Sequence, residues 1–201
     1  MKKLQSTLLN MLMSLVGICL VVSALLGLMY QVTLKPIAET NKAQEEAAIK
    51  EVVPGFDKKE EKKANINGEE ITYYVATKGG DVLGYAVKSF SNNGFSGHIS
   101  VMVGFDKDGK LNNYKVLEQA ETPGLGAKMQ DWFHSGKTQE ESASDFQKFE
   151  NVTISEPLKV TKDGGTVNAI TAATISSRAF LDAVNRAHEV FEYAKSNEGG
   201  K

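Results

Sequence analysis

The pattern of apolar and polar residues begins with one long apolar stretch. Residues 8–30 carry no charged side chain. As an α-helix rising about 1.5 Å per residue, this stretch is roughly 35 Å long, which is enough to cross a hydrocarbon core of about 30 Å. The alternative, a cleavable signal peptide, has a shorter apolar region and a small-x-small cleavage site after it, and no such site follows here. The pattern therefore predicts a transmembrane helix over residues 8–30, after an N-terminus of residues 1–7.

The next segments are mainly polar. Residues 36–53 carry a thin apolar stripe at helical spacing, and Pro54 and Gly55 end that pattern. We therefore expect residues 31–55 to form a helical stalk. The stretch DKKEEKKANINGEE, residues 57–70, is so highly charged that it predicts a solvated loop.

The remaining pattern predicts one domain of mixed structure. Alternation of apolar and polar residues predicts β-strands, and Asp106 to Gly109 reads as a hairpin turn between the last two of them. The predicted strands are residues 71–76, 82–90, 98–105 and 111–120.

Helical patterns dominate the C-terminal part. Short helices are expected over residues 127–133 and 142–149, and residues 151–160 read as a strand. The clearest helix has apolar residues at helical spacing, namely Phe180, Val184, Ala187 and Phe191, with Ala183, Val190 and Ala194. The order of elements predicts an α+β fold, with a mainly antiparallel sheet and packed helices over residues 56–197 and a disordered tail over 198–201.

Composition narrows the functional classes. The chain has 201 residues, 23 basic and 25 acidic, with a net charge of −2, and no block of like charge indicates a nucleic-acid partner. Its one cysteine, Cys19, excludes an intramolecular disulfide and any Cys-based zinc or iron–sulfur site. The three histidines lack metal-ligand spacing, so no metal site is expected.

The lysines around the apolar helix predict its orientation. Lys2 and Lys3 precede the helix, and only Lys35 lies close behind it. The positive-inside rule then places the N-terminus in the cytoplasm and the domain outside.

Two nucleotide-binding motifs are incomplete. Gly136-Lys137-Thr138 ends like a phosphate-binding loop, but Asp131 stands at the position of its first glycine. Gly124-Leu125-Gly126 begins like a dinucleotide fingerprint, but Met129 stands at the third glycine position. The sequence therefore indicates no site for ATP or NAD.

The run VNAITAATISSRAF, residues 167–180, precedes and opens the last predicted helix. Thr174 has two interpretations there. Its hydroxyl could cap the helix. It could instead hold a phosphate ester, because a helix N-terminus offers unpaired N–H groups to an anion.

The stretch NAITAATISS resembles the flavinylation motif of a known FMN-binding domain. The G subunit of the Rnf complex and the C subunit of the sodium-pumping NADH:quinone reductase share this domain. Their motif reads acidic residue, two spacers, Ser or Thr, Gly, Ala and the modified Thr. The resemblance makes Thr174 the modified residue, with Thr171 and Ala173 at matching positions. Asn168 replaces the acid and Ala172 replaces the glycine.

Residues 92–132 resemble the central segment of the same family, including its ETPGLG signature at 121–126. The resemblance implies FMN contacts for Glu121, Thr122, Pro123, Gly124, Leu125, Gly126, Thr171, Ala173, Ile175 and Ser176. It implies recognition by a flavin transferase for Asn168, Thr171, Ala172, Ala173 and Thr174.

The chain length fits the Rnf G subunit better than the longer quinone-reductase protein. The resemblance then implies an electron-transfer subunit of a membrane-bound, ion-translocating ferredoxin:NAD oxidoreductase, a translocase of class EC 7, without independent turnover. FMN would be joined through its phosphate to Thr174. The implied partners are the A, B, C, D and E subunits of the Rnf complex, the flavin transferase and the lipid bilayer, with the FMN domain on the periplasmic side of the inner membrane.

Two alternatives stay open at this point. One is the C subunit of a sodium-pumping NADH:quinone reductase. The other, from a different class, is an anchored, non-redox binding module, which the departures Asn168 and Ala172 favour.

Overall fold

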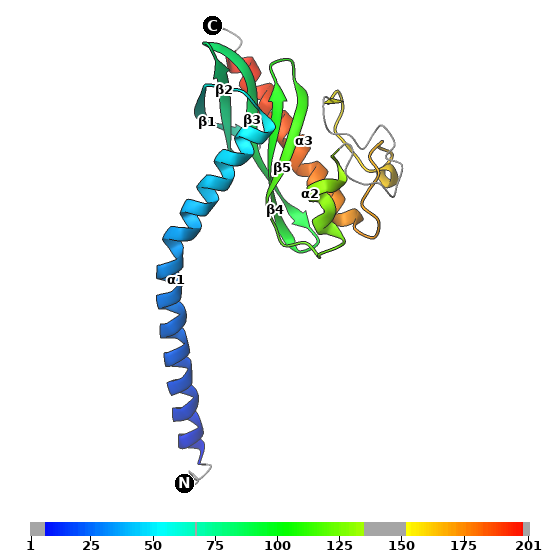
Figure 1. Ribbon diagram of the computed structural model, residues 1–201. Helices are drawn as coiled ribbons and strands as arrows, with labels where there is room; N and C mark the ends of the chain where they lie inside the picture. The colour runs from blue at the N-terminus through cyan, green and yellow to red at the C-terminus, as the bar shows by residue number, and fades with distance from the viewer. Residues whose placement is uncertain (1–6, 67, 135–151, 199–201) are drawn as a thin grey trace. The chain divides into compact units, whose positions relative to one another are not determined.

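The computed structural model describes residues 7–66, 68–134 and 152–198 (Figure 1). These residues fall into two compact units, which are residues 1–44 and 45–201. The predicted helix over residues 142–149 and the last tail residues, 199–201, lie outside the described residues.

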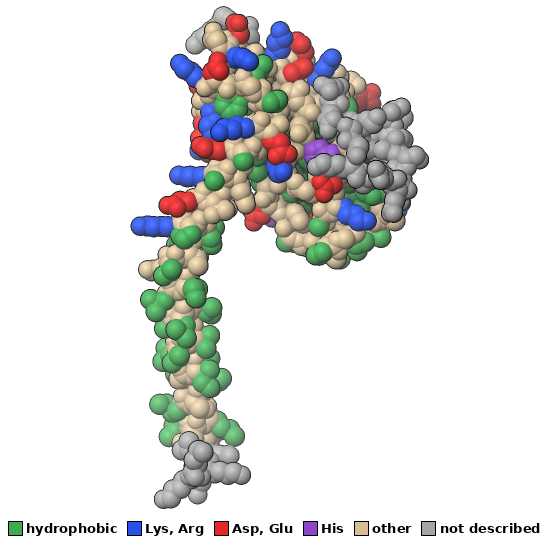
Figure 2. Space-filling view, in the orientation of Figure 1, with side chains coloured by type: hydrophobic (Ala, Val, Ile, Leu, Met, Phe, Trp, Pro, Cys, Tyr) green, Lys and Arg blue, Asp and Glu red, His purple; other side chains and the backbone are tan. Residues whose placement is uncertain are grey.

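The first unit is helical. It is formed by most of α1, a helix of 45 residues over Leu8–Val52 that continues through Pro36. The predicted membrane helix and stalk are therefore parts of one helix. The apolar side chains from Leu8 to Ile37 are exposed, and Figure 2 shows them along the helix surface. Within the described residues, α1 is the one helix long and apolar enough to cross a membrane.

The second unit is built on a six-stranded sheet in which sequential strands are neighbours and pair antiparallel. This arrangement confirms the predicted α+β class. The strands are β1 (Lys58–Ile66), β2 (Glu69–Lys78), β3 (Asp81–Gly94), β4 (Gly97–Asp106), β5 (Lys110–Gln119) and β6 (Val152–Thr153).

The prediction of a solvated loop over residues 57–70 is wrong, because most of this segment is β1 and the start of β2. β1 pairs with β2 from Lys58 to Ile66, and of its side chains only Ala64 is buried. β1 is an edge strand that is held in the sheet by backbone hydrogen bonds to β2. Because most of its side chains are exposed on both faces, its sequence shows no apolar alternation. Charged side chains on such an edge also oppose pairing with another chain.

The core lies on both faces of the sheet. On one face, α3 (Thr174–Glu198) places the predicted apolar stripe against the strands, and Phe191 packs on Phe105 and Tyr85 with ring centroids 5.1 and 5.3 Å apart. On the other face, the last residues of α1, from Ala48 to Val52, pack on β2, β3 and β4. Gly104 permits this approach, because a Cβ there would lie 2.3 Å from the Val52 carbonyl oxygen.

Shorter elements connect the sheet to α3. The predicted helix over residues 127–133 is present as a 3₁₀ turn, η1 (Gly126–Lys128), followed by α2 (Met129–Trp132). The predicted strand over residues 151–160 is reduced to β6 and an isolated bridge from Val160 to Val167. A second 3₁₀ turn, η3 (Thr161–Asp163), had no signal in the sequence pattern.

Candidate functional site

The first turn of α3 is closed by Ser177 and not by Thr174. The Ser177 hydroxyl accepts a hydrogen bond from the Ile170 N–H at 2.9 Å and donates to the Ala173 carbonyl at 3.0 Å. Thr174 is the first helical residue, and among the described contacts its hydroxyl has one polar partner, Lys162 Nζ at 3.4 Å. The capping interpretation of Thr174 therefore does not describe this helix.

The start of α3 also presents free backbone donors. The N–H groups of Thr174, Ile175 and Ser176 have no acceptor one turn earlier in the helix, and no hydrogen bond within the described residues uses them. They lie at the positive end of the helix dipole.

Ala172, two residues before Thr174, has left-handed backbone geometry. Its φ of 61° is the one positive φ at a non-glycine residue in the described chain. This geometry costs an L-residue roughly 1–2 kcal/mol, and glycine avoids the cost. The turn thus explains physically why a flavinylation motif has glycine at this position.

The loop of residues 121–126 is tied to the start of α3 through Glu121, which is 4% exposed. One Glu121 carboxylate oxygen accepts a 2.5 Å hydrogen bond from the Ser176 hydroxyl, and the other accepts the Ser96 N–H at 2.9 Å. Gly126 packs against the hydrogen-bonded Glu121 and Ser176 side chains. Only glycine fits there, because a Cβ would lie 2.4 Å from Ser176 Oγ. The carboxylate therefore joins three segments of the chain.

These three segments surround a cavity of about 310 Å³. Its volume is at the lower end of the range for small-molecule sites, roughly 300–1,000 Å³. The lining residues are Phe95, Glu121, Thr122, Leu125, Gly126, Ala172, Ala173, Thr174, Ile175 and Ser176. The structure thus brings most of the predicted site residues to one cavity, whereas Pro123, Gly124, Thr171 and Asn168 do not line it.

Large apolar side chains with high exposure stand around this cavity. Phe95 is 66% exposed, Ile175 48% and Leu125 40%. Phe95, which lies in the turn between β3 and β4, was not predicted from the sequence. The sequence feature that could have indicated Phe95 is an aromatic residue between two glycines of a turn, Gly94 and Gly97.

Lys162, which contacts Thr174, was also not predicted from the sequence. It lies in η3, next to Asp163, whose carboxylate forms two hydrogen bonds of 2.7 Å with the Arg178 guanidinium. This Arg178 contact holds the pKa of Asp163 below its usual range. The pair fastens η3 to the beginning of α3, beside Thr174.

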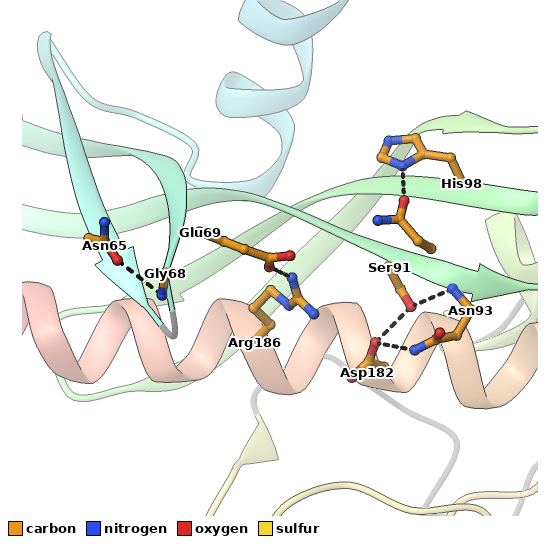
Figure 3. A network of polar contacts seen from close by, with 9 residues as sticks. Asn65, Gly68, Glu69, Ser91, Asn93, His98, Asp182 and Arg186 are labelled. Atoms are coloured by element: carbon orange, nitrogen blue, oxygen red, sulfur yellow. Dashed lines mark hydrogen bonds and ion pairs between the residues drawn. The ribbon is translucent and has the colours of Figure 1, made fainter.

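A polar network ties the end of β3, which precedes the turn with Phe95, to α3 (Figure 3). Asp182 of α3 accepts hydrogen bonds from the Ser91 hydroxyl at 2.7 Å and the Asn93 side-chain amide at 3.3 Å, both near the end of β3. One turn later, Arg186 forms an ion pair with Glu69 at the start of β2. The network fixes the end of β3 on the same helix that begins at Thr174.

Comparison with known proteins agrees with this geometry. The FMN-binding domain family matches residues 94–189, which include both the 121–126 loop and Thr174. The G subunit of the Na(+)-translocating ferredoxin:NAD(+) oxidoreductase complex of Acetobacterium woodii is 31% identical over 185 residues, which are 86% of this chain and 86% of that protein. The chain belongs to this G-subunit family.

Other members of the family are similarly related. The G subunit of the ion-translocating oxidoreductase complex of Methanosarcina acetivorans is 29% identical over 197 residues, covering 94% of this chain and 96% of that protein. The corresponding protein of Shewanella piezotolerans is 32% identical over 130 residues, and the match covers 55% of that protein. The family suggested by the sequence resemblance is thereby confirmed, and this member of it has an FMN-binding domain.

Proposed function

We propose that this protein carries FMN covalently, through a phosphoester bond to the Thr174 hydroxyl, and transfers electrons within a membrane-bound, ion-translocating oxidoreductase complex. One observation supports the proposal most directly. The Thr174 hydroxyl is not used to cap α3, and Thr174 lines a cavity with mainly apolar walls inside an FMN-binding domain.

The residues around Thr174 suit the phosphate end of FMN. The free N–H groups of Thr174, Ile175 and Ser176 are donors for phosphate oxygens, and the helix dipole favours a negative charge there. Ala172, with its left-handed backbone geometry, lines the same cavity as Thr174.

The cavity walls suit the other end of the cofactor. Phe95, Leu125 and Ile175 offer apolar contact area to a planar ring, and the buried Glu121 carboxylate holds the segments that bear them. When bound, FMN supplies the redox chemistry, and the protein supplies attachment, orientation and electrostatics.

The apolar part of α1 is the proposed membrane anchor. Its side chains from Leu8 to Ile37 are exposed, as expected of a helix surrounded by lipid. Lys2 and Lys3 favour a cytoplasmic N-terminus and an FMN domain on the periplasmic side. The proposed partners are the A, B, C, D and E subunits of the Rnf complex and a flavin transferase that attaches the cofactor. The alternative of a quinone-reductase C subunit has no support from the relatives named above.

Mass spectrometry of the tryptic peptide that ends at Arg178 tests the proposal. The wild-type peptide is expected to carry an FMN-sized adduct, Thr174→Ala to carry none, and Thr174→Ser to retain part of it. Thr166→Ala is the matched control, because it removes an exposed hydroxyl on the same peptide that does not line the cavity. An adduct that persists in Thr174→Ala would move the site to a neighbouring hydroxyl, and a colourless wild-type chain would favour the non-redox binding module.

A further inference from the structure

Lys162 is a cation in contact with the proposed attachment atom. Its ammonium nitrogen lies 3.4 Å from Thr174 Oγ1. Among the ion pairs of the described residues, Lys162 has no carboxylate partner, although Asp163 is its neighbour in the chain. A cation placed over a hydroxyl and left without a counter-ion is suited to an anion that the hydroxyl would carry.

Building on the proposed function, we propose that Lys162 is the ionic partner of the phosphate group attached to Thr174. The ammonium group donates hydrogen bonds to the phosphate oxygens, and such charge-assisted bonds are about twice as strong as neutral ones. A lysine suits this role because it acts as a compact point charge on a flexible stem.

The chain around Lys162 is built to hold it there. The backbone N–H of Thr161 donates to the Val167 carbonyl at 2.9 Å, and the Val167 N–H donates to the Lys159 carbonyl at 3.1 Å. Gly165 lies so close to this pairing that a Cβ would be 2.1 Å from the Lys159 carbonyl oxygen. The loop that carries Lys162 is therefore pinned at its base.

The Asp163–Arg178 ion pair is a second contact that holds the loop of Lys162, here against α3. Lys162 itself has no carboxylate partner among the ion pairs of the described residues. Both oxygens of Asp163 are engaged by the Arg178 fork at 2.7 Å. Arg178 is thus neutralised by Asp163, and the cation in contact with the Thr174 hydroxyl is Lys162. A phosphodiester has one negative charge, so the charges match.

The test compares the full chain, in detergent, with and without attached flavin. The variants are Lys162→Met, Lys162→Arg and, as a matched control on the same loop, Lys159→Met. In the flavinylated protein, Lys162→Met is expected to lower the Tm by about 2–4 °C more than in the unmodified protein. Lys162→Arg should restore the Tm, and Lys159→Met should lower it equally in both states.

A reduced adduct fraction in Lys162→Met, restored in Lys162→Arg, would also support the inference. Full attachment in every variant, with equal Tm losses in both states, would overturn the role of Lys162 and leave the proposed function intact. A wild-type peptide without any adduct would instead overturn the proposed function and, with it, this inference.

Discussion

Glu121 and Ser176 are 55 positions apart in the sequence, yet their side chains share a 2.5 Å hydrogen bond, with both residues almost fully buried. Glu121 also accepts the N–H of Ser96 in the turn between β3 and β4. One carboxylate thus holds together the loop, the turn and the helix start that surround the cavity. The geometry of the candidate site depends on this contact.

Removing the Ser176 hydroxyl should destabilise the domain. Ser176→Ala leaves a buried carboxylate oxygen without its donor, which costs about 1–3 kcal/mol of unfolding free energy. Glu121→Gln should cost less, because its amide can still accept from the Ser96 N–H and donate to Ser176. Urea unfolding of the full chain measures both changes.

The same pair should show energetic coupling. The double variant Glu121→Ala/Ser176→Ala should lose less unfolding free energy than Glu121→Ala and Ser176→Ala lose in sum. The expected difference is about 0.5–3 kcal/mol. Thr171→Ala, at an exposed site nearby, should change stability by about 0.5 kcal/mol or less. Strictly additive losses would show that the two side chains do not act as a unit.

Ala172→Gly should stabilise the protein. Glycine relieves the strain of the left-handed backbone, which raises the free energy of unfolding by roughly 1–2 kcal/mol. Its greater conformational entropy in the unfolded state lowers the free energy of unfolding by about 0.5–1 kcal/mol. A net gain of about 0.5–1 kcal/mol is therefore expected in urea unfolding. Ala169→Gly is the control, because Ala169 packs on the core without positive φ and should lose stability. A loss in Ala172→Gly would contradict the strain argument.

Stability should fall as the pH drops below neutral, in part through His188. Burial of this side chain beside Phe105 and Phe191 lowers its pKa, and the carboxylates of Glu192 and Glu189 oppose the shift only in part. Because the folded-state pKa is below the unfolded value of about 6.5, the unfolded state takes up the proton first. The contribution of His188 is therefore complete above a pH of about 6.5 and is lost as the pH falls through the folded-state pKa.

His188→Gln tests this pH dependence, because glutamine does not titrate. The loss of unfolding free energy between about pH 7.5 and about pH 5.5 should be smaller in the variant than in the wild type. Equal losses in the two proteins would show that His188 does not contribute.

The proposed topology can be tested by labelling. In a Cys19→Ser background, Lys58→Cys on the exposed edge strand β1 should react with an impermeant maleimide in intact spheroplasts. Leu25→Cys, in the apolar part of α1, should stay unlabelled before lysis. Labelling of residue 58 only after lysis would reverse the orientation.

The sequence by itself determined the elements whose signals are local. The uncharged run of α1 and the apolar spacing of α3 follow from side chains a few positions apart, and so does the alternation in β2 to β5. The motif around Thr174 was also readable, because its residues are consecutive. These features needed no knowledge of what lies opposite them.

The tertiary structure decided what depends on partners distant in the sequence. β1 is a strand because β2 supplies its hydrogen bonds, and its own side chains do not show it. The hydroxyl that closes the first turn of α3 belongs to Ser177, and only the folded backbone shows that Thr174 does not close it. Phe95 and Lys162 reach the site through a turn and a 3₁₀ helix whose positions are set by contacts with α3. A sequence pattern records which face of an element is buried, whereas a cavity is made by the packing of separate segments.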